Sequence, residues 1–379
     1  MLSALLYDFL LFVMVICLFV SGYLISRSDI SYWKGAIFGI VVYSLNEGLR
    51  FGRGIDYNLY VDVFNLIKQG DVSDHEPLFV LSCKMVGFVG GTWPFFVFLM
   101  SAFFIVSVYV FLQNFKRYVV CCLPVLPFFS MFAENIVRQT MGFSFLLIGL
   151  YFLLKKNSSI ILFLFFSFMG VLCHSVTLIF ALLFFLMTFR KKILLSPKYS
   201  IPLFFLLLFT FKTDNLMIMM SLFTSLMIGE HYTQYAENPE FWLQNGFVDS
   251  VSYTVTALYL FVVYYGYKIR IFFGRKYEYI YNIFLLGFLF YPISVRIELL
   301  SRIGVILEMF IFIVLGCIFY YYVFFKKIQS NIVTFSLLCI LSLNLARVYF
   351  VTPFQNPVQY LYMWDANGRE KLDVGDFKN

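Results

Sequence analysis

Residues 158–189 read SSIILFLFFSFMGVLCHSVTLIFALLFFLMTF and contain no Asp, Glu, Lys or Arg. A membrane-spanning helix needs about 20 apolar residues, so this run is too long for a single crossing. The polar break falls at His174, and we expect one span on each side of it, at 158–173 and 175–189. The stretch therefore predicts two transmembrane helices that meet at an ionisable side chain.

The composition of the whole chain agrees with a lipid environment. Hydrophobic residues make up 61% of the 379 positions and charged residues only 13%, whereas a soluble domain has about 25% charged residues. The net charge is +7, but the Lys and Arg residues form short clusters between apolar runs, as in cytoplasmic loops. This pattern excludes a soluble globular protein and offers no basic surface for nucleic acid.

Apolar runs of similar length recur along the chain, and we expect an all-α polytopic membrane protein with about 12 transmembrane helices (range about 11–14). Residues 1–351 would form a single transmembrane domain, followed by a short polar C-terminal tail at 352–379. The first run lacks a positive start and a small-residue cleavage site, so it is expected to be retained. Besides the two spans on either side of His174, the expected spans are 5–25, 34–49, 94–114, 118–133, 138–154, 199–211, 250–267, 278–295, 303–325 and 331–351.

The basic clusters predict which side of the membrane each loop occupies. All of them fall on the cytoplasmic side if residues 77–91 form a re-entrant segment, which is the interpretation we favour. A full crossing at 77–91 would move every later cluster to the other side. The re-entrant interpretation leaves the N-terminus and the loops 50–76 and 212–249 outside. The clusters are Arg27 with Lys34, Lys116 with Arg117, Lys155 with Lys156, Arg190 to Lys192 with Lys198, Lys268 to Lys276, and Lys326 with Lys327.

Cys and His residues give no sign of a metal or cofactor. The seven Cys lie mostly inside apolar runs and form no C-x-x-C pair, so we interpret them as small buried hydrophobic residues. The three His, at 75, 174 and 231, are far apart in sequence. We therefore expect no metal site and no cofactor.

The informative charges are those outside the cytoplasmic clusters, beginning with RFGRGIDYNLY at 50–60. Arg is a planar donor suited to phosphate, although both Arg residues here would also suit lipid headgroups. Gly52 and Gly54 permit an unusual turn or a close approach to a ligand. In HEPLF at 75–79, Glu76 precedes Pro77. It is either a functional carboxylate or a group stabilised by a helix dipole.

Three further polar positions lie in or beside apolar sequence. In ENIVRQTM (134–141), Arg138 is four residues after Glu134, so that the two either pair on one helix or leave Arg138 for a ligand. His174 is either functional or a satisfied structural histidine. In SVRIELLSRIGVILE (294–308), Arg302 is four residues after Glu298. Such charges form an internal ion pair or line a polar cavity.

On the expected topology these charges gather toward the outer face, a pattern that favours an anionic substrate such as a lipid-linked diphosphate. The ordered motifs R-x-x-R-G-x-D-Y-x-x-Y (50–60), E-P-L-F (76–79), V-R-Q (137–139), C-H-S (173–175) and S-R-I (301–303) occur in this sequence. In this order they resemble EpsG-like polymerases, which belong with the Wzy-type O-antigen and exopolysaccharide polymerases. The resemblance extends from about residue 30 to about residue 350.

The resemblance implies a GT-C-like glycosyltransferase membrane fold and an O-antigen-type polymerase of polysaccharide or lipopolysaccharide biosynthesis. Undecaprenyl-diphosphate-linked oligosaccharide would be donor and acceptor, at the outer, periplasmic face of the bacterial inner membrane. A chain-length regulator protein would be a further partner. The implied site residues are Glu76, His174 and Asp56 for catalysis; Arg50, Arg53, Arg138 and Arg302 for the diphosphate; and Tyr57, Tyr60, Gln139, Glu298, Tyr232 and Trp242 for the glycan.

Other functions stay open at this point. A flippase or transporter of lipid-linked oligosaccharide would show repeat symmetry and charges along a central path, and neither is evident here. A ligase that moves glycan to another acceptor would share the same chemistry. The outer loops lack the Asp-x-Asp metal motif of nucleotide-sugar enzymes, so we expect a metal-independent glycosyltransferase.

Overall fold

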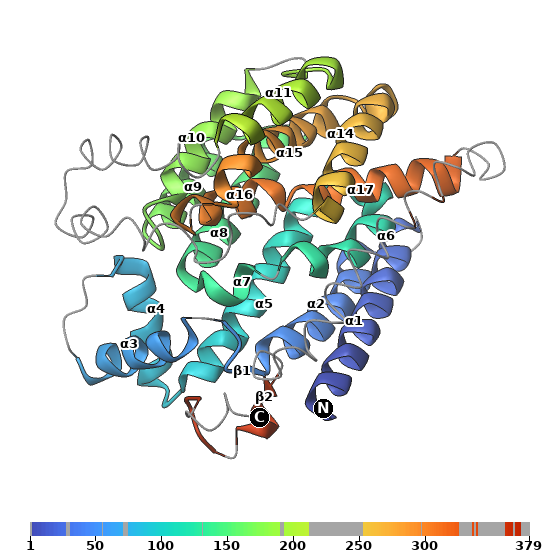
Figure 1. Cartoon of the computed structure of the whole chain (residues 1–379). Helices are drawn as coiled ribbons and strands as arrows, with labels where there is room; N and C mark the ends of the chain where they lie inside the picture. Colours follow the sequence, from blue (N-terminus) through green and yellow to red (C-terminus); the bar gives the residue numbers. More distant parts are fainter. Residues whose placement is uncertain are drawn as a thin grey trace, which may run out of the picture. The chain divides into compact units, whose positions relative to one another are not determined.

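The part of the chain that the computed structural model describes is helical apart from one two-stranded sheet (Figure 1). It divides into two compact units, Met1–Leu186 with Ala346–Asn379, and Met187–Leu345, each of which is described by itself. The expectation of a single domain therefore stays a prediction. The structure describes residues 2–27, 31–54, 56–70, 75–130, 132–189, 193–211, 253–296, 298–325, 336, 339, 361–366 and 368–372.

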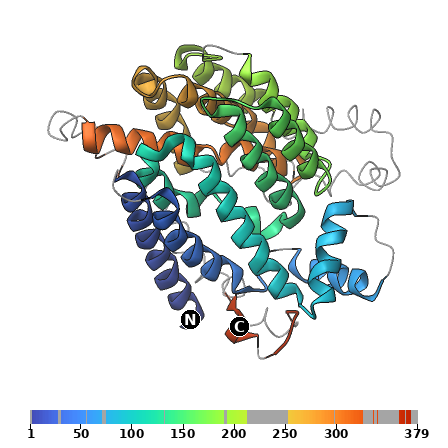
Figure 2. The same cartoon turned by 180° about the vertical axis from the view of Figure 1, so that it is seen from behind.

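The first unit begins with a helical hairpin, α1 (Leu2–Ser26) and α2 (Tyr32–Gly48), whose helices lie side by side in both views (Figures 1 and 2). The side chain of Ser31 accepts a hydrogen bond from the backbone N–H of Lys34 and caps α2. Within the hairpin, the Ser21 hydroxyl donates to the carbonyl of Gly35 at 2.8 Å. Small side chains at such contacts let two membrane helices approach closely.

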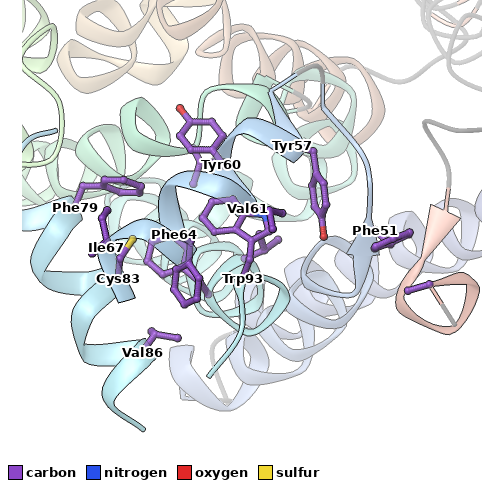
Figure 3. Close-up of a cluster of buried hydrophobic side chains, with 14 residues drawn as sticks. Phe51, Tyr57, Tyr60, Val61, Phe64, Ile67, Phe79, Cys83, Val86 and Trp93 are labelled. Atoms are coloured by element: carbon purple, nitrogen blue, oxygen red, sulfur yellow. The ribbon is translucent and has the colours of Figure 1, made fainter. Parts of the chain in front are cut away.

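Three helices follow and meet in one aromatic cluster: α3 (Tyr57–Gln69), α4 (Pro77–Phe88) and α5 (Trp93–Leu112) (Figure 3). The Trp93 ring stacks on Tyr60 at 5.5 Å and on Phe96 at 5.2 Å. Each such pair contributes about 0.5–1.5 kcal/mol beyond the area it buries. The cluster fixes the ends of α3, α4 and α5 relative to one another.

Helix α4 is short for an apolar helix. It has 12 residues, which rise about 18 Å, whereas the hydrocarbon core of a bilayer is about 30 Å thick. Residues near both of its ends, Phe79 and Val86, pack into the same aromatic cluster. Helices α9 (Ile160–Val171) and α10 (Thr177–Thr188) have the same length of 12 residues, so the length of α4 does not distinguish a re-entrant segment from a crossing, and the re-entrant interpretation of 77–91 stays a prediction.

The remaining helices of the first unit turn where the sequence breaks its apolar runs. Pro124 and Pro127 lie in a 3-10 stretch, where the missing N–H of proline prevents a regular α-helix. The expected hairpin at His174 is present, because residues 172–176 form the turn between α9 and α10. The elements are η1 (Gln113–Tyr118), α6 (Val119–Cys122), η2 (Leu123–Phe129), α7 (Phe132–Asn135), α8 (Val137–Leu154), α9 (Ile160–Val171) and α10 (Thr177–Thr188).

The two-stranded sheet joins distant parts of the sequence. Strand β1 (Arg50–Phe51) pairs antiparallel with β2 (Leu361–Tyr362), so that Arg50 lies opposite Tyr362. The short 3-10 helix η7 (Met363–Asp365) follows β2. Part of the polar tail expected at 352–379 is thus packed onto the first unit.

The second unit is a helical assembly in which α15 packs against α11, α14 and α16. Its helix α15 starts after Gly274, whose φ of +74° is one that glycine adopts without strain. Its elements are α11 (Pro197–Thr210), α14 (Tyr253–Phe273), α15 (Arg275–Ser294), α16 (Glu298–Glu308), α17 (Ile311–Tyr320) and the π-helical turn η4 (Tyr321–Phe325).

The described residues include five helical segments that are long and apolar enough to cross a membrane. They confirm an all-α, membrane-type protein, while the expected number of about 12 crossings stays a prediction. The expected span 331–351 and the outer loop 212–249 lie outside the described residues, apart from positions 336 and 339. The five segments are Leu5–Ser26, Trp93–Phe129, Val137–Leu154, Val255–Phe273 and Leu300–Phe325.

Candidate functional site

The start of α4 and the start of α8 are joined by an ion pair. Arg138 Nη1 donates to Glu76 Oε2 at 2.7 Å, a short, charge-assisted hydrogen bond. Glu76 is the N-cap residue of α4, and Arg138 is the second residue of α8. Both side chains keep some exposure, 19% for Glu76 and 24% for Arg138, so that a ligand can reach them.

The turn between α9 and α10 brings His174 to the same place. Its Nδ1 lies 3.9 Å from Glu76 Oε1, and the backbone N–H of Ser175 donates to that oxygen at 3.3 Å. The backbone N–H of Val176 donates to His174 Nδ1 at 3.3 Å. An imidazole nitrogen that accepts a hydrogen bond carries no proton, so that the neutral ring is protonated on Nε2. Glu76, Arg138 and His174 therefore form one cluster, which we call the Glu76 cluster.

Two glycines hold the elements of the Glu76 cluster together. Gly142 lies one helical turn after Arg138, and Gly170 lies one turn before His174. A Cβ at Gly142 would come within 2.8 Å of the Gly170 carbonyl oxygen, and a Cβ at Gly170 within 2.7 Å of the Gly142 carbonyl oxygen. Only glycine permits this approach of α8 and α9, which sets the distance between Arg138 and His174.

The surroundings of Glu76 favour its charged form. Burial opposes ionisation of the carboxyl, but backbone N–H donors, Arg138 and His174 outweigh it and lower the pKa of Glu76 below its usual value. Glu76 is therefore ionised at neutral pH while it is paired with Arg138. Arg138 Nε is buried and has no hydrogen-bond partner within the described part of the chain. The exposed part of the Arg138 side chain, 24% of it, is the part that an oxyanion could reach.

A second charged cluster surrounds Arg53, whose side chain is 1% exposed. Its Nη1 lies 3.3 Å from Glu134 Oε1 and 3.8 Å from Glu47 Oε2. The rings of Tyr362 and Tyr7 pack on the guanidinium, at 4.6 and 5.0 Å from their centroids. A buried cation needs such partners, because an unpaired one would cost several kcal/mol. We call this group the Arg53 cluster.

Arg50 extends this network toward α5 and α7. It donates to the carbonyls of Glu47 and Ala133 at 3.0 and 3.3 Å, and to the Ser101 hydroxyl at 3.3 Å. A small pocket beside it, with room for about one water molecule, is also lined by Thr140. The expected turn at the glycines is present, because Gly52 and Gly54 have φ of +67° and +106°.

The structure corrects one expected pairing. Glu134 and Arg138 are four residues apart, but they do not share a helix, because Ile136 breaks the chain between α7 and α8 with φ −102° and ψ 59°. Pairing at that spacing requires a continuous helix. Glu134 instead pairs with Arg53, and Arg138 pairs with Glu76.

The expected glycan residues of the first unit are mostly buried. Tyr57, Tyr60 and Gln139 are inaccessible, and the first two belong to the aromatic cluster (Figure 3). Tyr60 also interacts electrostatically with Arg138. Asp56 precedes α3 and makes no cap hydrogen bond to it. The roles of these four residues in binding or catalysis stay predictions.

The remaining expected residues lie elsewhere. Arg302 is on α16 in the second unit, and the side chain of Glu298, like Tyr232 and Trp242, lies outside the described residues. The second unit also holds a buried carboxyl, because Tyr259 donates to Glu308 Oε2 at 2.7 Å. The roles predicted for Arg302, Glu298, Tyr232 and Trp242 are untested.

Sequence inspection missed part of the Arg53 cluster. The contacts of Arg53 with Glu47, Tyr7 and Tyr362 were not expected, and Tyr362 is more than 300 positions away in sequence. The only local signal was Glu47, an acidic residue at the end of an apolar run, which has to find a partner. The rest depends on long-range packing.

Among the described residues, no group of three His, Cys, Asp or Glu side chains could hold a metal ion. The expected metal independence stays a prediction.

The comparison with protein families confirms the resemblance to EpsG-like proteins that the ordered motifs suggest. The family model of the EpsG family matches residues 35–362. Searches of curated proteins and of solved structures found no match. The matched region contains the Glu76 cluster and all of the Arg53 cluster except Tyr7. The chain therefore belongs to the EpsG family, and this membership together with its apolar helices indicates a polysaccharide-polymerase-like membrane protein.

Proposed function

We propose that this protein is a polysaccharide polymerase of the O-antigen type. It joins undecaprenyl-diphosphate-linked oligosaccharide repeat units by glycosyl transfer at the outer, periplasmic face of the bacterial inner membrane. The observation that carries the proposal is the Glu76 cluster, which combines a partly exposed arginine, a carboxylate and an imidazole in a membrane-type protein of the EpsG family.

The distribution of charge along the helices of the first unit supports an outer location. Glu76, Arg138 and His174 lie at one end of α4, α8 and α9. The basic pairs Lys116 with Arg117 and Lys155 with Lys156 lie at the opposite ends of α5 and α8. Basic loops remain in the cytoplasm, so the opposite helix ends face outward.

Arg138 would bind the diphosphate of the donor. When the bond between the anomeric carbon and the diphosphate oxygen breaks, negative charge grows on the leaving lipid diphosphate. A guanidinium held by protein contacts stabilises that charge more in the transition state than in the ground state. Arg138 suits this role better than Arg53, because Arg53 is 1% exposed and Arg138 is 24% exposed.

Glu76 would be the general base. In the resting structure Arg138 holds its pKa low, which makes it a weak base. A bound diphosphate competes for Arg138 and weakens the Glu76 pair, so that burial then raises the pKa of Glu76. The carboxylate accepts the proton of the acceptor hydroxyl as that oxygen bonds to the anomeric carbon. Donor binding thus prepares the base.

His174 and the Arg53 cluster would act as supports. His174 lies 3.9 Å from the Glu76 carboxylate and accepts the Val176 N–H at Nδ1, and it would help to orient that carboxylate. Arg53 anchors Glu134, four residues before Arg138, and so holds the start of α8. The diphosphate-binding role predicted for Arg302, in the second unit, is proposed on the resemblance of the S-R-I motif alone. The full protein would have about 12 crossings and a GT-C-like fold, and a chain-length regulator would be its partner.

Purified protein in detergent, given lipid-linked repeat units, tests this proposal against a flippase. No bilayer is present, so that transport produces no change, whereas polymerisation produces longer glycans on the lipid carrier. We expect a ladder of glycans that grows with time and with the amount of protein. A folded, monodisperse preparation that leaves every unit at its starting length would contradict the proposal.

A further inference from the structure

Residues 361–366 and 368–372 are packed on residues 50–54, which carry Arg50 and Arg53 and which we call the arginine loop. The reaction proposed above gives this C-terminal segment no part. Strand β2 pairs with β1, and the backbone N–H of Met363 donates to the carbonyl of Leu49 at 2.8 Å. The segment therefore contacts Leu49, which lies immediately before the arginine loop, and strand β1 within the loop. It is separated from that loop by more than 300 residues of sequence.

Tyr362 contacts both the buried cation and its surroundings. The residue is 1% exposed, and its ring packs on Arg53 at 4.6 Å. Its hydroxyl donates to Asn46 Oδ1 at 2.9 Å, and Asn46 Nδ2 donates to Glu47 Oε1 at 2.9 Å. Glu47 faces Arg53 in turn. Tyr362 therefore orients the guanidinium directly and one of its two carboxylates through Asn46.

A second set of contacts ties the end of the segment to α3. Asn58 forms two hydrogen bonds with the backbone of Leu372, donating to its carbonyl at 3.1 Å and accepting from its N–H at 3.0 Å. Lys371 pairs with Asp62. The side chain of Leu372 lies against Gly52, where a Cβ would come within 2.4 Å of it. The arginine loop is thus enclosed between the segment and α3.

We propose that residues 361–372 form an outer-face strap and that Tyr362 is a positioning residue for the polymerisation site, a role that rests on the proposed function. The Tyr362 ring packs on Arg53, and Arg53 pairs with Glu134 on α7. Glu134 lies just before the break in the chain after which α8 begins, and Arg138 is the second residue of α8. The strap shares a sheet with β1, so it lies on the same side of the membrane as Arg50.

Substitutions of Tyr362 test the positioning role. Tyr362→Phe keeps the ring on Arg53 and should retain activity within about threefold. Tyr362→Leu removes the ring and the hydroxyl and should lower kcat/KM for lipid-linked repeats about tenfold or more. We expect the loss in Tyr362→Leu to be mainly in kcat, since Arg138 would be misplaced for the transition state. A folded Tyr362→Leu protein with wild-type kcat would overturn the proposal.

One truncation and one milder variant guard against misfolding. A chain that stops after Leu372 keeps every described strap contact and should match the wild type. If Tyr362→Leu does not fold, Asn58→Ala replaces it, because it removes only the two hydrogen bonds to the strap. Asn58→Ala should lower kcat about threefold or more. Unchanged activity in folded Asn58→Ala, or loss of activity on stopping after Leu372, would count against the strap.

Labelling from outside tests the side of the strap without depending on catalysis. A cysteine at Lys371, whose side chain is 43% exposed, should react with a membrane-impermeant maleimide in cells with an intact inner membrane. A matched cysteine at the exposed Asn157, next to Lys155 and Lys156, should react only after the membrane is opened. The reverse pattern would overturn the outer location. If the wild-type protein shows no polymerisation but Lys371→Cys is labelled, the proposed function fails while the strap's location stands.

Discussion

At the scale of single residues, Glu134 is a carboxyl whose surroundings oppose its charge. Burial raises its pKa to about 7, Arg53 counteracts this, and the nearby Glu47 adds to it. The single positive charge of one guanidinium cannot fully compensate the negative charges of two carboxylates. The folded protein therefore binds a proton at Glu134 between pH 4.5 and about 7, where the unfolded chain has released it.

The sign of the resulting pH dependence follows from this raised pKa. Glu134 contributes stability below pH 4.5 that is lost as the pH rises through about 7. In Glu134→Gln this dependence is absent. We therefore expect the thermal midpoint of the wild type in detergent to fall relative to that of Glu134→Gln between pH 5 and pH 8. Glu278→Gln, in the second unit, is the control for removing a carboxyl. Parallel pH curves for the wild type and Glu134→Gln would contradict the assignment.

The sequence identified the important charges better than it identified their partners. The sequence analysis singles out three ionisable residues in or beside apolar runs, Glu76, Arg138 and His174. The structure brings these three side chains together. Their mutual pairing was not predictable, because it depends on contacts between helices that are far apart in the chain. The nearby Glu134 was the obvious partner of Arg138 only on the assumption of an unbroken helix at Ile136.

At the scale of elements, the crossing of α8 and α9 determines the geometry of the Glu76 cluster. Gly142 and Gly170 bring the two backbones together one turn away from Arg138 and His174. A methyl group at Gly142 would meet Thr177 Oγ1 at 2.4 Å and the Gly170 carbonyl oxygen at 2.8 Å. Because one of these is a backbone atom, α8 and α9 would have to separate.

Gly142→Ala is therefore expected to impair catalysis. Small displacements of positioned groups cost about a hundredfold in rate, so we expect a loss of about tenfold to a hundredfold in kcat. The control is Gly149→Ala on the same helix, whose Cβ would meet only Phe163 and Phe166 atoms at 3.3–3.4 Å. Kinetics of both purified variants check the prediction. Equal kcat for Gly142→Ala and Gly149→Ala would show that this crossing does not control the site.

Element types were predictable from the apolar runs, but two arrangements were not. The helical hairpin at His174 follows from the length of the run 158–189 and its one polar break. The pairing of β1 with β2 could not be foreseen, because each strand has two residues and too little pattern to show strand character. Sheet pairing between ends of a chain is decided by tertiary packing rather than by local propensity.

At the scale of the whole molecule, the β1–β2 pair restricts the membrane topology. Paired strands lie on one side of the membrane, so the chain crosses it an even number of times between Phe51 and Leu361. The predicted spans between these positions are even in number, and a full crossing at 77–91 would make them odd. The structure joins two of these predicted spans, 94–114 and 118–133, in one helical segment, Trp93–Phe129, so that the parity alone does not decide between a re-entrant segment and a full crossing at 77–91.

The most direct measurement is glycan polymerisation by purified Arg138 variants with lipid-linked repeat units. We expect Arg138→Ala to lower kcat/KM about a hundredfold or more, as loss of a transition-state donor does. Arg138→Lys should recover only part of it, since Lys lacks the planar fork. Arg117→Ala, at the exposed basic end of the first unit, should match the wild type. A folded Arg138→Ala protein that makes long glycans at the wild-type rate would contradict the account.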